Sequence, residues 1–304
     1  VGDTVEVAFD EVEPTRGEYG RILCYVYYDS TGDGEPDTHY NREIVSEGYA
    51  RVYSSGFGRH DDFAAEETEA IESDRGVWSG SDIDSLDPYR NQQFDEMFFP
   101  EAVEVDPGSG EGVVSVSGSP VACIDEDAGL AAVGGLIIHE DYESDYEFGT
   151  DTSGYGNYPF LTNLIYYLSE KEGDVFFEGG HRQFSTEGSM TLEDAAWYRR
   201  HVEGTGRRLR QVNDLTETLS DVDAAGLIVS PPAEPYTDAE TEAVSRFVSE
   251  GGSVVLLGSA ASDNHGNLNQ IPEALGTDVR LTDSRVTDGS NNLTSPEIPL
   301  TSEF

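Results

Sequence analysis

The sequence predicts a two-domain protein of mixed class: a partial β-barrel with helices over residues 1–80, a linker over 81–112, and a doubly wound parallel α/β domain over 113–304. Its 304 residues suit two domains, because single domains usually hold about 100–200 residues. Early runs that alternate polar and apolar residues are typical of half-buried strands. Later continuous apolar runs, separated by amphipathic segments, indicate buried parallel strands and helices.

The composition is strongly acidic. Asp and Glu number 61 against 17 Lys and Arg, which gives a net charge of −44, and Lys171 is the only lysine. Periodic apolar segments recur along the chain, so we expect folded cores rather than disorder over most of it. The composition resembles that of extremely halophilic archaea. At molar salt the Debye length falls to about 3 Å, so the net charge does not exclude a nucleic-acid partner, which it would repel at low salt.

Cysteine usage and hydropathy bear on the compartment. Cys24 and Cys123 are far apart in sequence, and we expect two buried free thiols rather than a disulfide. No apolar run approaches the roughly 18 residues of a membrane span, so no transmembrane segment is expected. Val1 begins inside a strand pattern, as expected of a cut or processed terminus. The acidic surface suits both a salt-filled cytoplasm and a brine exterior, and an extracellular or cell-surface location is slightly favoured over a cytoplasmic one.

The first 80 residues contain strand and helix patterns in alternation. Residues 5–9 and 19–28 are predicted to form a hairpin of a small barrel of the oligonucleotide/oligosaccharide-binding (OB) type. Residues 41–52 and 61–74 are predicted helices. The acidic stretch 29–37 lacks the full calcium-loop pattern and is expected to be a solvated turn. The first helix should face inward through Ile44, Val45, Gly48 and Tyr49, Gly76 should stop the second helix, and Trp78 should be a buried anchor.

Three sequence blocks in this region follow one another in a recognisable order. They are Y-G-R-I-L-C-Y-V-Y from Tyr19, N-R-E-I-V-S-E-G-Y-A-R-V from Asn41, and a helix with Glu66 and Ala70 that leads to R-G-V-W at Trp78. In order and spacing they resemble the thermonuclease (micrococcal-nuclease-like) family. That resemblance implies phosphodiester cleavage at a Ca²⁺ site, where two arginines hold the phosphate, a carboxylate positions water and aspartates bind the metal. One of those arginines corresponds to Arg21, and the implied partner is DNA or RNA.

The chain also departs from that family. The second arginine, the catalytic glutamate and the metal-binding aspartates of the family come from strands upstream of the piece that resembles residues 5–9. Nothing in this sequence occupies those positions, and half a barrel would leave unpaired strand edges. We therefore expect no complete Ca²⁺ site and no nuclease activity from this chain as given. The alternative for Arg21 is a solvated arginine, or one paired with Glu18.

The rest of the chain predicts α/β architecture. Residues 79–112 carry turn chemistry, interrupted by an apolar patch at Phe94 and residues 97–99 that is expected to dock on a core. A strand at 113–116 and a loop at 141–156 are expected. The other predicted strands are 135–138, 174–177, 209–212, 226–230 and 253–258, and the predicted helices are 159–168, 191–202, 215–222 and one capped by Thr237 and Glu240.

The segment from Ile228 to Leu257 resembles the glutamine-amidotransferase-like domains of gliding-motility and ABC-transport accessory proteins. The resemblance rests on the runs I-V-S-P-P, Y-T-D-A-E and F-V-S-E-G-G-S-V-V-L-L. The resemblance implies an amidotransferase-like (flavodoxin-type) fold. An amidotransferase nucleophile would be a Cys on a strand-to-helix turn, whereas this chain has G-S-A-A after Leu257. We therefore expect a non-catalytic domain that binds a ligand or a protein partner.

Ligands of parallel α/β sheets bind beyond the carboxyl ends of the strands, and three predicted loops end there. The candidate crevice residues on them are Glu178, His181, Ser230, Ser259 and His265. Glu178 and His181 suit a general acid/base pair, with a hydrogen-bonded loop histidine as the alternative. No metal-ligand spacing appears. Three functions remain open: a nuclease-related nucleic-acid protein, a non-enzymatic cell-surface or transport-accessory binding protein, and a hydrolase centred on Glu178 and His181.

Overall fold

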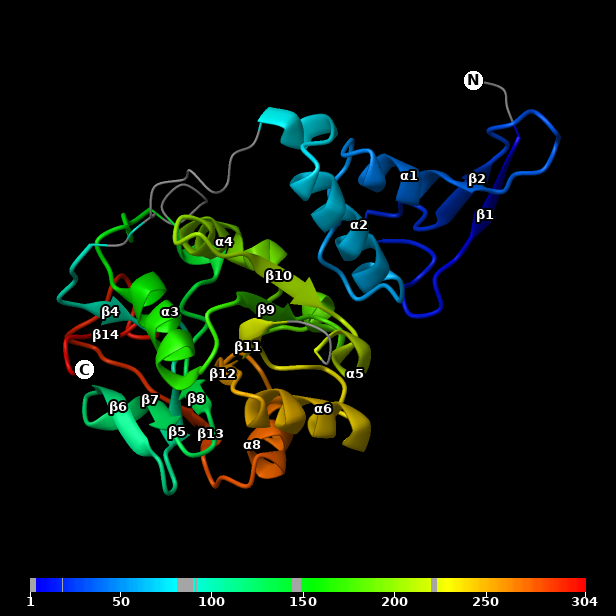
Figure 1. Ribbon diagram of the computed structural model, residues 1–304. Coiled ribbons are helices and arrows are strands. Elements are labelled where there is room, and N and C mark those ends of the chain that lie inside the picture. Colours follow the sequence, from blue (N-terminus) through cyan, green and yellow to red (C-terminus); the bar gives the residue numbers. More distant parts are fainter. Residues whose placement is uncertain (1–3, 18, 81–89, 91, 144–148, 220–222) are drawn as a thin grey trace. The chain divides into compact units, whose positions relative to one another are not determined.

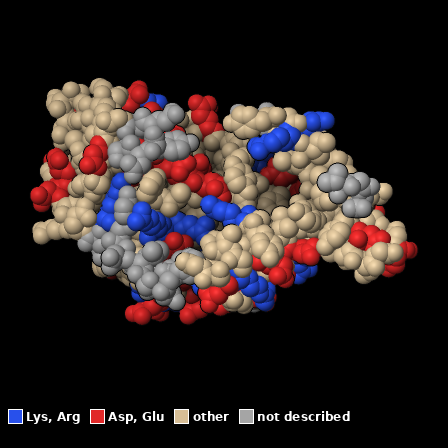
Figure 2. All heavy atoms as spheres, turned by 90° about the horizontal axis from the view of Figure 1, so that it is seen from above, with Lys and Arg blue, Asp and Glu red and all other residues tan. Residues whose placement is uncertain are grey.

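The computed structural model describes residues 4–17, 19–80, 90, 92–143, 149–219 and 223–304. The chain divides into two compact units, Val1–Asp82 and Ile83–Phe304, called unit 1 and unit 2 below (Figure 1). Acidic side chains are scattered over the face in Figure 2, while Lys and Arg gather in small groups. No helix in the described parts is long and apolar enough to cross a membrane.

Unit 1 is a three-stranded antiparallel sheet with two helices. Strand β1 (Val5–Ala8) pairs with β2 (Tyr25–Tyr28), and β2 pairs with the short β3 (Thr38–His39). Helix α1 (Tyr40–Ser46) and α2 (His60–Glu72) pack on one another, and a 3₁₀ helix spans Gly76–Gly80. The small core consists of Tyr25, Val45, Val52 and Phe63.

Two elements of unit 1 are shorter than the sequence predicts. The predicted strand 19–28 is regular only in β2, and residues 15–17 pair irregularly with residues 21–23. The predicted helix 41–52 ends after Ser46 because Gly48 takes a φ of +70° and the chain turns. Tyr49 is therefore exposed rather than inward, and Trp78 is half-buried rather than buried.

Unit 2 is built on a seven-stranded, mostly parallel sheet in the order β10-β9-β11-β12-β8-β7-β6. The five strands from β10 to β8 are parallel, and β7 and β6 add an antiparallel edge. This confirms the predicted mixed class with a large parallel sheet. The strands are β6 (Glu111–Val116), β7 (Ser119–Asp125), β8 (Leu130–Val133), β9 (Asp174–Glu178), β10 (Leu209–Val212), β11 (Ala224–Val229) and β12 (Ser253–Leu257).

Each parallel strand contributes to two cores, one on either face of the sheet. In β12, Val255 and Leu257 join one apolar cluster while Val254 and Leu256 join the other, as the alternation of a strand requires. Helix α3 (Asn157–Leu168) packs on β8, β11 and β12, and α4 (Ala196–Glu203) packs on α3. On the other face lie α5 (Leu215–Thr218), α6 (Asp238–Ser249) and α8 (Gln270–Ala274), after the short α7 (His265–Leu268).

Several local predictions in unit 2 need correction. Residues 135–138 do not form a strand: β8 ends at Val133, and the buried apolar run after it is a turn. The predicted helix 191–202 is split into a 3₁₀ helix (Glu193–Ala195) and α4. The predicted helix 215–222 is regular in α5, and residues 220–222 lie outside the described residues.

The segment expected to be a linker contributes strands to unit 2. Strand β4 (Met97–Phe98) pairs with β14 (Leu300–Thr301), and β5 (Val103–Asp106) pairs with β13 (Arg280–Arg285). Met97, Phe98 and Phe99 are buried, as expected of an apolar patch that docks on a core. The carboxyl-terminal segment therefore joins residues 97–106 in two small sheets beside the main one.

Two glycines of unit 1 are in mutual backbone contact, which gives a test of its packing. A Cβ on Gly76, whose φ is +54°, would lie 2.3 Å from the Gly48 carbonyl oxygen. We expect Gly76→Ala to destabilise unit 1 by about 2 kcal/mol or more, because left-handed strain of about 1–2 kcal/mol adds to the clash. Urea unfolding followed by Trp78 fluorescence in a Trp197→Phe background measures this.

Gly20→Ala is the matched control for that variant. Gly20 also has a positive φ, of +71°, but a Cβ there meets nothing within 4 Å. It should therefore lose only the conformational part, about 1–2 kcal/mol. Equal losses in the two variants would show that the contact between Gly48 and Gly76 does not constrain unit 1.

Candidate functional site

Arg21 is exposed and lies where residues 21–23 pair with residues 15–17. Backbone hydrogen bonds from Leu23 to Thr15 (3.1 Å) and from Gly17 to the Arg21 carbonyl (2.9 Å) form this pairing. The Arg21 guanidinium lies 5.5 Å from the centre of the Tyr19 ring. Among the described residues no carboxylate is within ion-pair distance of it, and Glu18 lies outside them. Arg21 is therefore placed to meet an anion from solvent.

Asp10 connects three segments of unit 1 through hydrogen bonds. Its carboxylate accepts hydrogen bonds from the Tyr25 hydroxyl and from the backbone N–H groups of Val12 (2.9 Å) and Gly58 (3.1 Å). Partial burial acts to raise the pKa of Asp10, but these hydrogen bonds outweigh it and the pKa is lowered. Burial and the contact with Asp10 raise the pKa of Tyr25. The hydrogen bonds of the Asp10 carboxylate therefore stabilise the fold of unit 1.

A mainly apolar hollow of about 400 Å³ opens beside β2 and α1. Its walls include Ile22, Leu23, Cys24, Ile44, Val45 and Phe63. Nearby apolar side chains are exposed, among them Val5 and Val7 of β1, at 50% and 47%. Within the described chain, no group of three or more His, Cys, Asp or Glu residues could hold a metal ion. The described residues alone therefore do not supply the cluster of ligands that the thermonuclease resemblance implies for Ca²⁺.

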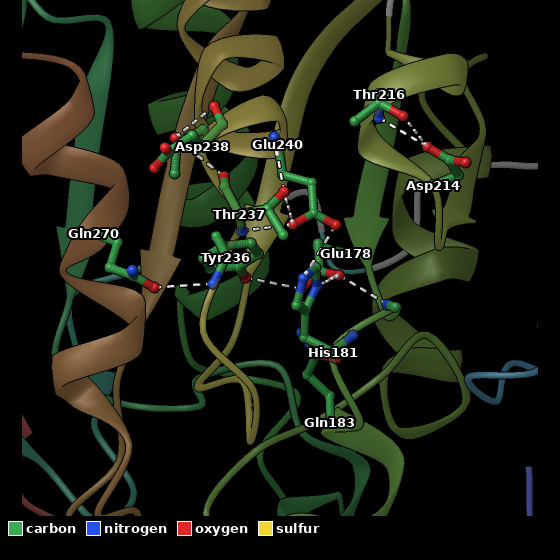
Figure 3. A network of polar contacts seen from close by, with 12 residues as sticks. Glu178, His181, Gln183, Asp214, Thr216, Tyr236, Thr237, Asp238, Glu240 and Gln270 are labelled. Carbon is green, nitrogen blue, oxygen red and sulfur yellow. Dashed lines mark hydrogen bonds and ion pairs between the residues drawn. The ribbon is translucent and has the colours of Figure 1, made fainter. Parts of the chain in front are cut away.

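In unit 2, Glu178 ends strand β9 at a point where the order of the sheet reverses. The strand that follows β9 lies on one side of it, whereas β11 on its other side is followed by β12, farther away. Such a switch point is where ligands of parallel sheets bind. Glu178 is completely buried. Its carboxylate accepts from His181 Nδ1 (2.9 Å), Gly180 N–H (2.7 Å), the Tyr236 hydroxyl (2.9 Å) and the Gln183 amide (Figure 3).

His181 lies between two carboxylates. Its Nδ1 donates to Glu178, and its Nε2 is 3.3 Å from Glu240 Oε1 (Figure 3). Burial lowers the pKa of His181, but the hydrogen bonds and charges of Glu178 and then Glu240 outweigh burial, so the pKa is raised. An imidazolium that donates from both nitrogens has no lone pair with which to accept a proton. In this arrangement both ring nitrogens of His181 face carboxylates, one on β9 and one on α6.

Glu240 is held in place by the start of α6. Its Oε2 accepts from the Thr237 backbone and hydroxyl, both at 2.7 Å, within the capping box that the sequence predicts. Burial raises the pKa of Glu240, but the hydrogen bonds from Thr237 and the charge of His181 lower it overall. The helix cap therefore also fixes the second carboxylate around His181.

A polar cavity of about 140 Å³ lies near the carboxyl ends of β8 and β12. Two serines that line the cavity, Ser189 and Ser259, contact residues outside its lining. Ser189 Oγ is 2.8 Å from Ser230 Oγ, and the Ser259 N–H donates to His265 Nε2 at 3.3 Å. His265 Nδ1 in turn contacts Asp283 at 2.9 Å. The lining residues are Pro100, Glu101, Leu136, His139, Asp141, Tyr142, Gly188, Ser189, Ser259 and Ala261.

Ser259 directs a hydroxyl toward this cavity. The residue is only 1% exposed, and its Oγ accepts from the Ala261 N–H at 3.2 Å. Among the described residues no acceptor takes the Ser259 hydroxyl hydrogen, so that hydrogen can reach a molecule in the cavity. Glu101 on the rim has a φ of +48°, which is uncommon for a residue with a side chain and occurs more often at functional sites.

The five residues predicted for one crevice thus lie in two places. Glu178 and His181 form a buried network with Tyr236, Gln183 and Glu240, whereas Ser259 lines the cavity. Ser230 and His265 support cavity residues rather than line the cavity. The sequence analysis missed Ser189, Gln183, Tyr236 and Asp283. Of these, only Gln183 could have been found from the sequence, because it follows Glu178 within one predicted loop.

Comparison with known proteins bears chiefly on unit 1. Residues 3–80 match the family model of the staphylococcal nuclease homologues. This supports the thermonuclease resemblance for that part of the chain, and with it an OB-like fold. An uncharacterized protein of Methanocaldococcus jannaschii is 37% identical over 78 residues, which cover 26% of this chain and 36% of that protein. The chain thus spans about a third of the length of this relative.

Solved structures give a distant likeness over most of the chain. The IMPa metallopeptidase from Pseudomonas aeruginosa in complex with an O-glycopeptide has a TM-score of 0.42 at 14% identity, covering 81% of this chain and 26% of that one. The same enzyme in complex with T-antigen gives a TM-score of 0.42 at 14% identity, with 79% and 26% covered. A likeness at this level implies neither activity nor ligand.

The His181 network predicts how the stability of unit 2 depends on pH. Because the folded-state pKa of His181 is raised above 6.5, its contribution is complete below about pH 6.5 and is lost as the pH rises through the folded-state value. Each unit of pKa difference corresponds to about 1.4 kcal/mol. Urea unfolding between about pH 5 and pH 9, followed by Trp197 fluorescence in a Trp78→Phe background, should show this decline.

His181→Gln should remove most of that decline. His139→Gln is the control, because His139 is also in unit 2 but lies 3.7 Å from Asp141 at the cavity rim. The control should keep the wild-type dependence on pH. A His181→Gln protein that loses stability with pH as steeply as the wild type would contradict the bridging role of His181.

Proposed function

We propose that residues 3–80 bind the phosphodiester backbone of a nucleic acid, with Arg21 in contact with a phosphate. The observation that carries this proposal is the match of these residues to the staphylococcal nuclease homologues, with Arg21 in its Y-G-R motif. The exposure of Arg21 supports it, because a guanidinium can donate two parallel hydrogen bonds to phosphate oxygens.

The proposal is limited to binding. Cleavage of a phosphodiester needs fixed cations around the charge that develops in the transition state. The described residues offer no group that could hold Ca²⁺, and the Asp10 carboxylate is engaged with Tyr25 and backbone N–H groups. We therefore expect this chain by itself to bind nucleic acid without cutting it.

Arg21→Ala tests this function. We expect the affinity for fluorescently labelled single-stranded DNA to fall several-fold, and the slope of log K against log salt to become shallower by about 0.7, the value for one phosphate contact. Fluorescence anisotropy over a range of KCl concentrations up to molar measures both, and gel electrophoresis with and without Ca²⁺ detects cutting.

Arg42→Ala is the matched control. Arg42 is also in unit 1 and its side chain is 64% exposed, but it is paired with Glu66. It should bind DNA like the wild type. Unchanged binding by Arg21→Ala would reject the phosphate contact. Ca²⁺-dependent cutting that Arg21→Ala abolishes would reject the restriction to binding and mean that a metal site is completed elsewhere.

A second candidate function belongs to unit 2, the part that resembles non-catalytic amidotransferase-like domains. The observation that favours this second function is the polar cavity, which Ser259 lines. Its lining contains Asp141 and also Glu101, which is paired with Arg285 at 2.9 Å, but no described Lys or Arg, which disfavours an anion. This fits a ligand-binding accessory protein that takes a small protonated amine. The hydrolase alternative ranks last, because both ring nitrogens of His181 already contact carboxylates, Glu178 and Glu240.

Thermal unfolding in the presence of ethanolamine tests the cavity. A ligand that binds the folded state raises the melting temperature with concentration. We expect ethanolamine to raise it in the wild type, a weaker effect in Ser259→Ala, and no effect of acetate at the same ionic strength. An equal shift with acetate, or no shift with ethanolamine, would rule out an amine pocket here.

A further inference from the structure

Basic residues are concentrated in one short stretch of unit 2. Residues 197–213 contain five of the 17 Lys and Arg residues of the chain and a single acidic residue, in a protein with 61 acidic residues. The stretch comprises α4, β10 at the edge of the sheet, and the turn between them. We call its arginines, Arg199, Arg200, Arg207, Arg208 and Arg210, the arginine band. Figure 2 shows basic side chains in a row on the side of unit 2 that carries α4 and β10.

Arg207 is held rigidly without a carboxylate partner. Its guanidinium donates to the carbonyl oxygens of Glu172 (3.1 Å) and Thr205 (3.3 Å) and lies 4.4 Å from the centre of the Tyr166 ring. Within the described part of the chain no carboxylate is within ion-pair distance of it. Neutral carbonyl groups orient a guanidinium but leave its positive charge available to an anion.

Two other arginines of the band each contact one carboxylate. Arg199 contacts Glu203 at 3.1 Å and Arg210 contacts Asp174 at 3.1 Å, with side chains 21% and 28% exposed. The Arg210 guanidinium also lies 5.0 Å from the centre of the Phe176 ring. Arg200 is exposed on α4. Because each guanidinium has five N–H donors, one carboxylate leaves donors for a second anion.

We propose that the arginine band binds the phosphate backbone of a nucleic acid. It rests on the proposed function of residues 3–80 for the identity of the polyanion, and adds a second contact surface for it. Guanidinium groups stacked on aromatic rings match phosphate oxygens in planar, bidentate hydrogen bonds. At raised salt the long-range repulsion from the acidic surface is screened, because the Debye length is about 10 Å at 0.1 M. The charges in direct contact with the ligand then dominate.

The double variant Arg200→Gln/Arg207→Gln tests the band. With labelled single-stranded DNA we expect weaker binding and a slope of log K against log KCl that is shallower by about 1.4, the value for two phosphate contacts. Arg200→Lys/Arg207→Lys should restore most of the slope, because the charges remain. Circular dichroism melting of each variant shows whether unit 2 stays folded.

Arg182→Gln/Arg246→Gln is the matched control. It removes the same charge from unit 2, at an arginine that contacts Glu234 and at an exposed arginine of α6. It should bind DNA like the wild type. Equal losses in the two double variants, or no DNA binding by the wild type, would overturn the proposal. So would a folded band variant that loses as much affinity for poly-glutamate as for DNA, which would assign the surface to an acidic protein.

Arg21→Ala separates this inference from the proposed function. If Arg21→Ala binds DNA like the wild type while the band variant binds it weakly, the function of residues 3–80 fails and the band stands. If Arg21→Ala is weak and the band variant is normal, the band fails and the function of residues 3–80 stands.

Discussion

The buried carboxylate of Glu178 constrains the carboxyl edge of the sheet in unit 2. An ionised carboxylate without water is very unfavourable unless hydrogen bonds and positive charge satisfy it. Here the donors come from Tyr236 and from the loop after β9, whose His181 also faces Glu240. Removal of one donor would leave this buried carboxylate with one hydrogen bond fewer. This single side chain thus fixes the loop after β9 and the start of α6 relative to one another.

Patterns among residues that are close in sequence were enough to predict most of the helices and strands around Glu178. The capping box of Thr237 and Glu240 and the apolar run of β12 depend on neighbours in sequence, and both were predicted. The contact between Glu240 and His181 joins residues 59 positions apart, and the Tyr236 hydroxyl reaches Glu178 across 58 positions. Sequence periodicity does not reveal such pairings, so the prediction joined in one crevice residues that the fold divides between a buried network and a cavity.

The failed predictions have related physical causes. Residues 135–138 are apolar and buried like a strand, but they are a turn after β8, and apolar content alone cannot distinguish the two. The helix predicted to reach Val52 ends because Gly48 packs against the backbone near Arg75, a contact made by a residue 27 positions away. For the candidate site, Arg21 was found from its motif, whereas Ser189 and Asp283 became visible only when the loops were brought together.

The two thiols of the protein lie in very different surroundings. Burial raises the pKa of Cys123 in β7 to about 12, so at neutral pH it remains a protonated, inert thiol. Cys24 is half-buried and lines the apolar hollow of unit 1. A thiol-directed fluorophore or spin label should therefore modify the folded protein at Cys24 alone. This places a reporter beside the segment that carries Arg21 without any engineered cysteine, and movements of unit 1 can be followed spectroscopically while unit 2 stays unlabelled.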